Sequence, residues 1–246
     1  MGTEFCPHEI IWTPEKIGRF WGYFAHNKAC EENFFSRMVG DAIINLASCY
    51  RELGGNILDY GCGHGFLIEK LLKRGIRCEG LEFSTDSAGK VEQKFRSEKN
   101  FGGVTIAQCL PTPLEADKYD LVFILETIEH LLPQWLDQTI SEIYRITTKG
   151  GLILATVPNE ENLEARKVMC PECGGIFHTV QHIISWTEET LVSRMSSVGF
   201  QCVVCKSTRL RESGMFSHVR YIAMLLAYKL TGRKMPHLIY IGKKPA

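Results

Sequence analysis

The chain has 246 residues, of which 45% are hydrophobic and 23% are charged, and its formal net charge is zero. This length and composition are typical of one folded domain with a substantial core, and they exclude a disordered chain. The lack of a basic excess argues against nucleic acid as the main partner.

The cysteines and the start of the chain indicate a cellular compartment. The ten cysteines are scattered, without the density of a secreted disulfide scaffold. Residues 1–7 lack the cationic and apolar segments of a signal peptide. We therefore expect reduced cysteines and a cytoplasmic protein.

The first predicted elements are helices in an N-terminal cap, residues 1–50. Apolar residues from Met38 to Leu46 recur at helical spacing. The cap also carries large aromatic side chains at Trp12, Phe20, Trp21, Tyr23, Phe24, Phe34 and Phe35. We interpret it as a lid over the substrate, although a helix pair that packs on a sheet explains the aromatic residues equally well.

The predicted main domain, residues 51–246, begins with a strand that runs into a glycine-rich loop. Residues 56–65 read Asn-Ile-Leu-Asp-Tyr-Gly-Cys-Gly-His-Gly, and the three glycines let the backbone turn tightly and approach a ligand. A helix at 66–74 and a strand at 78–83 follow. Glu82 lies about twenty residues after the loop, where an α/β nucleotide site places its ribose-binding carboxylate.

Two details argue against a dinucleotide as the ligand. A dinucleotide fingerprint is G-x-G-x-x-G, whereas this loop is G-x-G-x-G and position 66 is Phe. Asp59, at the end of the strand, would repel a pyrophosphate group but suits a ligand that carries an ammonium group.

The remaining elements alternate between strands and helices. Strands are predicted at 56–61, 78–83, 104–109, 119–126, 151–157, 200–205 and 237–242, and helices at 66–74, 84–98, 134–147 and 187–198. Thr187 is a helix cap, because two glutamates follow it in the first turn. The alternation predicts an α/β fold, with a mostly parallel sheet covered by helices on both faces.

Two inserts lie outside this alternation, a Cys/His insert at 159–186 and a second insert at 206–236. The second contains the apolar run 221–228, flanked by basic residues. This run is shorter than the ~20 residues that a membrane span needs. We expect a helix that covers the fold, and contact of 220–234 with a membrane surface or a lipophilic substrate is the alternative.

The four motifs together resemble the class I S-adenosylmethionine-dependent methyltransferases, similar to the type 11, 12 and 23 families. The resemblance is carried by residues 58–65, 80–84, 119–126 and 150–158, in order, within roughly 50–205. It implies a seven-stranded, mostly parallel Rossmann-like sheet in which the seventh strand, here 238–241, is antiparallel.

The same resemblance implies the cofactor contacts. Asp59, Gly61 and Gly63 would hold the methionyl part of S-adenosylmethionine, Glu82 the ribose hydroxyls, and Phe83 would stack beside the adenine. The acidic residue that often reads the adenine amino group is missing, and Gln108 or main chain takes its place. The full implied set is Asp59, Tyr60, Gly61, Cys62, Gly63, Glu82, Phe83, Gln108, Cys109, Leu110 and Glu126.

The chemistry is expected at the carboxyl end of the fourth strand, where the sequence reads Glu126-Thr-Ile-Glu-His130. Positions i, i+3 and i+4 share one helical face, so Glu126, Glu129 and His130 can converge. Two carboxylates and an imidazole this close favour a bound divalent cation. In the alternative, Glu126 touches only the cofactor, and Glu129 and His130 cap the next helix without a metal.

A second resemblance favours the metal. Glu-x-x-Glu-His, with a later His before Trp-Thr, is similar to the metal-dependent small-RNA 3′-end methyltransferases and to ubiquinone-pathway O-methyltransferases. It implies that Glu126, Glu129, His130 and His182 hold Mg²⁺, Mn²⁺ or a similar ion. The two imidazoles favour Mn²⁺ or a later metal over Mg²⁺, which prefers oxygen ligands.

His182 has a rival partner set, because Cys170, Cys173, His178 and His182 spell a possible zinc site. Zinc could instead use Cys170, Cys173, His178 and another residue, which leaves His182 to the active site. Two buried thiols without metal are the third possibility.

We therefore expect methyl transfer from S-adenosylmethionine to a hydroxyl of a small acceptor, such as a sugar or a catechol-like ring. His130, Glu129 and His182 are the candidate catalytic residues, and His130 would be the general base without a metal. The alternatives are a metal-independent N- or C-methyltransferase of a small metabolite and a non-catalytic accessory subunit. The intact glycine loop, with Glu82 and Glu126, argues against the accessory subunit.

Overall fold

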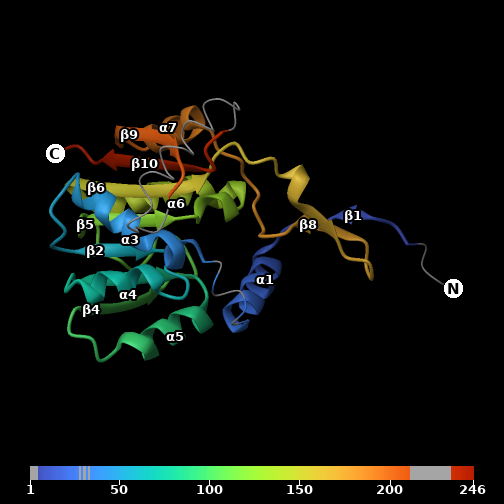
Figure 1. Cartoon of the computed structure of the whole chain (residues 1–246), viewed down its shortest axis with the longest axis horizontal. Helices are drawn as coiled ribbons and strands as arrows, with labels where there is room; N and C mark the ends of the chain where they lie inside the picture. Colours follow the sequence, from blue (N-terminus) through green and yellow to red (C-terminus); the bar gives the residue numbers. More distant parts are fainter. Residues whose placement is uncertain (1–4, 28, 30–31, 33, 211–233) are drawn as a thin grey trace, which may run out of the picture.

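The computed structural model describes residues 5–27, 29, 32, 34–210 and 234–246. An α/β body carries a smaller sheet that projects from one side (Figure 1). The run 221–228 and most of the segment 220–234 lie outside the described residues, so the cover helix and the membrane contact stay predictions. Within the described residues, no helix is long and apolar enough to cross a membrane.

The body contains a sheet of seven strands among the described residues, in the order β4-β3-β2-β5-β6-β10-β9. Strands β2 to β6 pair in parallel, and β10 is antiparallel to both β6 and β9. The strands are β2 (Ile57–Tyr60), β3 (Cys78–Glu82), β4 (Phe101–Ile106), β5 (Tyr119–Leu125), β6 (Thr147–Pro158), β9 (Gln201–Thr208) and β10 (His237–Lys243). The predicted Rossmann-like sheet and its antiparallel last strand are confirmed.

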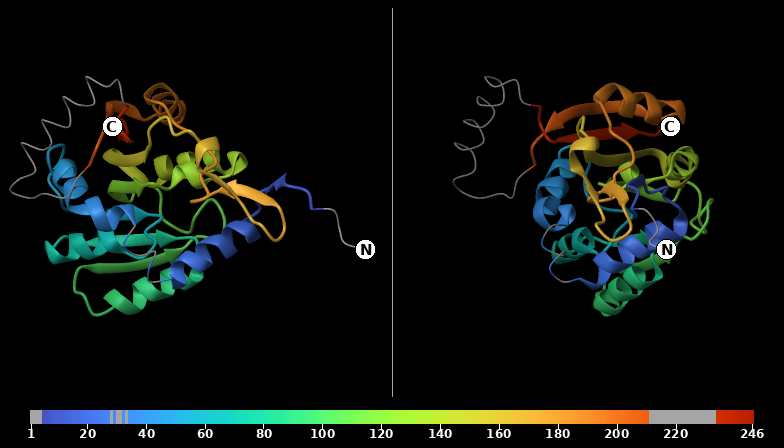
Figure 2. Two further views of the ribbon diagram at one scale, coloured as in Figure 1. Left: turned by 45° about the vertical axis from the view of Figure 1, so that its right-hand side comes forward. Right: turned by 90° about the vertical axis from the view of Figure 1, so that its right-hand side faces the viewer.

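Helices cover both faces of this sheet (Figure 2). One face packs on α3 (Phe35–Ser48), α4 (Phe66–Lys73) and α5 (Thr85–Phe95), and the other on α6 (Pro133–Ile146) and α7 (Glu188–Ser197). Side chains of β5 alternate between the two cores, with Leu121 and Phe123 in the first and Val122 and Ile124 in the second. Because successive strand residues point to opposite faces, a strand buried on both sides is apolar along most of its length, as Leu121–Leu125 are in β5.

Local signals set the helix starts. Ser84 caps α5, since its side chain accepts a hydrogen bond from the backbone N–H of Ser87. Thr187 and Thr190 form a reciprocal capping box at the start of α7, as the sequence predicts for Thr187. Leu132 precedes α6 without a side-chain cap, and Pro133 fits the first helical turn there.

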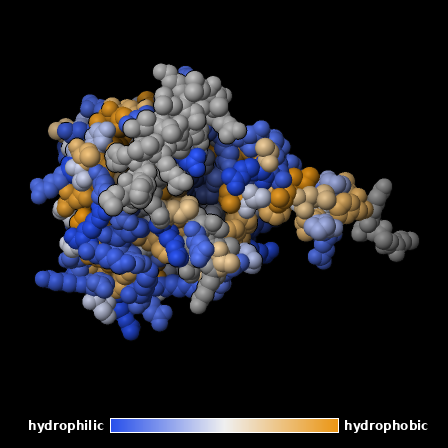
Figure 3. Space-filling model, in the orientation of Figure 1, coloured by the Kyte–Doolittle hydropathy of each residue, from blue (hydrophilic) through white to orange (hydrophobic). Residues whose placement is uncertain are grey.

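The N-terminal segment is only partly helical. Helix α1 (Pro14–His26) follows a short strand, β1 (His8–Glu9). This strand pairs in parallel with β8 (Gly175–His178), which is antiparallel to β7 (Lys167–Met169). The N-terminal cap and the Cys/His insert thus share one three-stranded sheet, which projects from the body and has apolar residues on its surface (Figure 3).

Candidate functional site

The glycine loop connects β2 to α4 at the carboxyl edge of the sheet. The backbone N–H groups of Gly61 and Cys62 donate to the carbonyl of Leu81 at 2.8 and 3.0 Å, which ties the loop to β3. Gly65 has φ +70°, and a Cβ there would lie 2.9 Å from the ring of Phe95. The loop therefore needs glycine for its left-handed backbone and for its contact with α5.

Glu82 joins this loop to the next one. Its carboxylate accepts hydrogen bonds from the backbone N–H groups of Gly63, Phe83 and Ser84 at 2.8, 2.9 and 3.0 Å. Burial raises the pKa of Glu82, and these three donors oppose that shift. One carboxylate thus organises the two loops that end β2 and β3.

The other residues predicted to hold the cofactor lie around the same edge. Asp59 is buried at the end of β2, and burial together with the Glu82 carboxylate raises its pKa to about 7. Phe83 is 38% exposed, with its ring centroid 6.0 Å from that of the buried Tyr60. Cys62 is buried within the loop, and Gln108, Cys109 and Leu110 follow the end of β4. The carboxyl ends of β2, β3 and β4 therefore gather the predicted cofactor residues.

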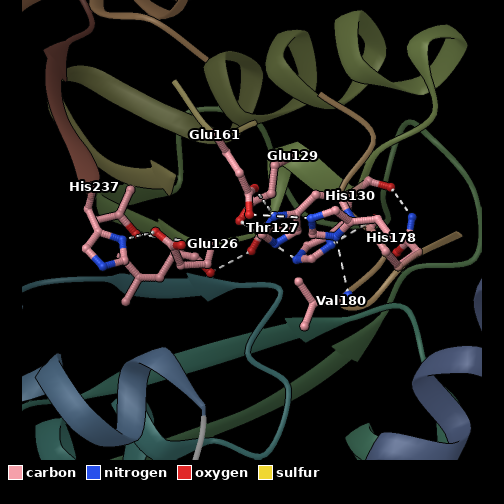
Figure 4. Close-up of polar contacts among 12 residues, drawn as sticks. Glu126, Thr127, Glu129, His130, Glu161, His178, Val180 and His237 are labelled. Carbon is pink, nitrogen blue, oxygen red and sulfur yellow. Dashed lines mark hydrogen bonds and ion pairs between the residues drawn. The ribbon is translucent and has the colours of Figure 1, made fainter. Parts of the chain in front are cut away.

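A cluster of carboxylates and imidazoles lies at the end of β5 (Figure 4). Glu129 and His130 belong to the short 3-10 helix η1 (Ile128–His130), and His182 lies in the segment 179–187 between β8 and α7. The Oε1 atom of Glu129 is 3.8 Å from Nε2 of His130 and 4.0 Å from Nε2 of His182. The sequence predicted this convergence, and these groups can hold one metal ion.

Glu129 is fully buried, and neither of its carboxylate oxygens has a hydrogen-bond partner. Burial raises its pKa well above the usual range, and the carboxylate of Glu126 raises it further. A buried carboxyl group without a partner is costly unless a cation neutralises it. The side chain therefore has the surroundings of a metal ligand.

His130 is held as a neutral imidazole. Burial, together with the neighbouring His182, lowers its pKa to about 3. Its Nδ1 lies 3.4 Å from the carbonyl of Gln181, so that contact leaves Nε2 as the atom facing Glu129. A neutral imidazole with one nitrogen engaged is the form that binds metals.

Helix α1 supports this arrangement from the outside. The indole N–H of Trp21 donates to the side-chain oxygen of Gln181 at 2.8 Å, and the Gln181 amide donates to the His130 carbonyl at 2.9 Å. The rings of Trp21 and His130 also meet edge to face, with centroids 4.9 Å apart. Helix α1 therefore contacts the site through Trp21.

Glu161 and His178 complete a second group of three with His182. Nδ1 of His182 contacts Oε2 of Glu161, and Nε2 of His178 lies 3.4 Å from Oε1 of the same carboxylate. The backbone N–H groups of Val180 and His182 donate to Nδ1 of His178. Glu161 thus contacts the ring nitrogen of His182 that does not face Glu129.

The sequence prediction missed Glu161 and assigned His178 to zinc. Glu161 lies three residues beyond the last residue of β6, at the carboxyl edge where ligand-binding residues gather. That position in the sequence could have identified Glu161 as a candidate site residue.

Glu126 does not join the three-residue group around His182, so the predicted convergence on one helical face is wrong for this residue. Its φ of +46° is left-handed, and the 3-10 turn begins only at Ile128. The helical spacing i, i+3, i+4 therefore does not apply. Its carboxylate instead lies 3.6 Å from Nδ1 of His237.

The predicted zinc set is not assembled around His178. Within the residues that the structure describes, no group of three close ligand atoms contains a cysteine. His178 faces Glu161 and His182, because β8 directs it toward the body. Cys173 is exposed and Cys170 partly so, which also rules out two buried thiols.

Comparison with known proteins also points to methyltransferases. A family model described as a methyltransferase domain matches residues 31–204. A ubiquinone biosynthesis O-methyltransferase of Paraburkholderia phytofirmans is 30% identical over 131 residues, which are 52% of this chain and 54% of that protein. A malonyl-acyl-carrier-protein O-methyltransferase of Serratia marcescens is 24% identical over 229 residues, covering 83% of this chain and 86% of that protein.

Solved structures agree on the fold. An S-adenosylmethionine-dependent methyltransferase of Clostridium acetobutylicum superposes with a TM-score of 0.63 at 14% identity, covering 92% of this chain and 99% of that one. The chain spans about half the length of the first curated relatives that it matches. The family model, in contrast, covers most of this chain, including the glycine loop, Glu82 and η1. The chain therefore belongs to the methyltransferase-domain family, and its fold is that of S-adenosylmethionine-dependent methyltransferases of known structure.

Proposed function

We propose that the protein methylates a hydroxyl oxygen of a small acceptor, assisted by a divalent metal that Glu129, His130 and His182 hold. The observation that carries this proposal is the fully buried Glu129 carboxylate, which has no hydrogen-bond partner and has two imidazole Nε2 atoms within 4.0 Å. Two imidazoles and one carboxylate fit Mn²⁺, Zn²⁺ or a similar ion better than Mg²⁺.

The chain's own residues would bind and align the reactants. Glu82 would accept hydrogen bonds from the ribose hydroxyls while it holds the loop N–H of Gly63. Asp59 would face the cationic methionyl part, and Phe83 offers an exposed ring to the adenine. Alignment of the sulfonium methyl with the acceptor oxygen would supply much of the rate. The metal, when bound, supplies a lower pKa to an acceptor hydroxyl and binds a neighbouring oxygen.

The acceptor class follows from this chemistry. A metal beside the methyl donor suits an acceptor with two adjacent oxygens, such as a catechol-like ring or a sugar diol. The zero net charge offers no excess of cations for a polyanion. The ubiquinone biosynthesis relative is named as an O-methyltransferase, which supports oxygen as the methylated atom.

Methyl transfer assays on a catechol, a sugar diol and an amine probe test the proposal. Labelled S-adenosylmethionine is the donor, and the enzyme is used chelator-treated and after Mn²⁺ is returned. We expect transfer to an oxygen acceptor that is lost with the chelator and restored by Mn²⁺. Transfer that is equal with and without the chelator, or that occurs only on the amine, would contradict the proposal.

The affinity for S-adenosylmethionine is expected to rise with pH because of Asp59. Its pKa is raised to about 7, so the group is mostly protonated below that pH and ionised above it. A cationic ligand favours the ionised form, so the Kd should fall about tenfold between about pH 6 and about pH 8. Calorimetric titration measures this change, and Asp59→Asn should remove most of it. An equally steep profile in that variant would assign the effect to another group.

Glu161→Gln is expected to weaken metal binding without removing it. The carboxylate contacts Nδ1 of His182 and so fixes which ring nitrogen faces Glu129. Loss of such an outer carboxylate costs about 10- to 100-fold in metal affinity. Titration of Mn²⁺ into the chelator-treated variant measures this loss, and S-adenosylmethionine affinity is the internal control. An unchanged Mn²⁺ affinity would remove Glu161 from the positioning role.

A further inference from the structure

We propose that Cys6, His8, Cys170 and Cys173 form a zinc site that joins the N-terminal segment to the Cys/His insert. This site is separate from the cluster at Glu129. It keeps Cys170 and Cys173 of the zinc set predicted from the sequence, and it uses Cys6 and His8 in place of His178 and of His182 or another fourth residue. The proposal rests on the turn at 170–175 and on the pairing of β1 with β8.

The turn at 170–175 has its two cysteine sulfurs close together. The backbone N–H of Gly174 donates to the carbonyl of Cys170 at 2.9 Å, and the N–H of Cys170 donates to the carbonyl of Gly175 at 2.8 Å. Backbone N–H groups of Cys173 and Glu172 also face the Cys170 sulfur. A C-x₂-C turn of this kind can supply two of the four ligands of a tetrahedral zinc site.

Strand pairing brings the other half to the same place. His8 is the register partner of Gly175, so their Cβ positions point to the same face of the small sheet. A Cβ on Gly175 would lie 3.4 Å from Sγ of Cys173, which puts that sulfur on the face of His8. The two side chains therefore lie on one side of the sheet.

Cys6 lies at the same end of this sheet. It precedes His8 by two residues, the spacing that returns a side chain to the same face of an extended segment. Its carbonyl oxygen would be 2.7 Å from a Cβ on Gly174, so the two backbones are in contact. The Cys6 thiol points to the carbonyl of Pro7 at 3.8 Å. Within the described residues no three of these four ligand atoms lie within 4.8 Å of one another, so a zinc ion would have to draw them together. Cys6 is exposed, and rotation about its Cα–Cβ bond can move its sulfur.

Such a site would act as a clip, that is, a metal cross-link that holds the N-terminal segment against the turn at 170–175. Strand β1 and the turn at 170–175 have few apolar residues to bury, and thiolate–zinc bonds can supply the folding free energy that a small sheet lacks. The site would also support β8, which ends at His178, and the segment after it that carries His182. Its role is structural, because three thiolates and one imidazole occupy all four coordination positions of a tetrahedral zinc ion and leave none for a substrate.

Plasma mass spectrometry of the purified 246-residue chain tests the proposal by measuring how much zinc each chain holds. A Glu129→Gln background weakens metal binding at the other cluster, so that mainly the clip is counted. We expect about one zinc per chain, most of it lost in Cys173→Ser and in Cys6→Ser. His178→Ala should keep the zinc, and so should Cys202→Ser, which removes an exposed cysteine elsewhere.

A second measurement uses the parent chain, so it does not depend on whether the variants fold. Cobalt substituted into the parent chain should give the intense sulfur-to-cobalt bands of a tetrahedral thiolate site. A parent chain without zinc, zinc retained in Cys173→Ser or Cys6→Ser, or zinc lost in His178→Ala would overturn the proposal. A cobalt spectrum without sulfur bands would overturn it as well.

Discussion

Glu129→Gln is expected to lower methyl transfer by at least about 100-fold, or about 2.7 kcal/mol of activation free energy. The amide is similar in size to the carboxyl group but cannot carry the charge that a divalent ion needs. The affinity for S-adenosylmethionine should change less than about twofold, since Glu82 and the glycine loop are untouched. Single-turnover rates and calorimetric Kd values on the same preparations measure the two effects.

The matched control for this variant is Glu164→Gln. It makes the same chemical change at a glutamate whose side chain is 78% exposed and pairs with Lys167. Its transfer rate should equal that of the parent. Glutamine has nearly the same size and shape as the glutamate that it replaces, so the variant should also fold. Full activity in Glu129→Gln would show that this carboxylate has no part in the reaction.

Glu82→Ala has the second large expected effect, a loss of at least about 100-fold in affinity for S-adenosylmethionine. Removal of the carboxylate leaves the N–H groups of Gly63, Phe83 and Ser84 without their acceptor, and it removes the predicted partner of the ribose. Each hydrogen bond to a charged group contributes about 1.5 to 3 kcal/mol, so two of them suffice for this loss. Calorimetry or equilibrium dialysis measures it.

Asp86→Asn is the control for the second variant. The carboxylate of Asp86 is exposed in the first turn of α5, four residues beyond Glu82. Its replacement should leave the Kd for S-adenosylmethionine unchanged. Parallel melting curves separate a binding defect from a folding defect. A Glu82→Ala protein that melts like the parent and still binds S-adenosylmethionine with the parent Kd would refute the assigned ribose contact.

The sheet and the glycine loop could be predicted because their signals are local. Strand β5 and the second half of β6 are apolar runs, and Gly61, Gly63 and Gly65 require a loop between β2 and α4. The first turns of α5 and α7 carry their own caps, so these helix starts were also predictable within a residue or two. The antiparallel position of β10 came from family resemblance and not from its own residues.

The candidate site could be predicted only in part, because its remaining features depend on tertiary contacts. Glu161 meets His182 across 21 positions of irregular chain, and no periodicity links them. The left-handed backbone at Glu126 depends on how β5 leaves the sheet, which helical spacing cannot anticipate. The pairing of β1 with β8 joins residues more than 160 positions apart. Only the fold itself brings these groups together.

The most direct test of metal-assisted methylation is anomalous diffraction at the manganese edge. Crystals would be grown with S-adenosylhomocysteine and Mn²⁺ from protein freed of metal by a chelator. We predict an anomalous peak bounded by Glu129, His130 and His182, with the cofactor product against Glu82 and the glycine loop. Fully bound S-adenosylhomocysteine without a peak at these three residues would contradict the account.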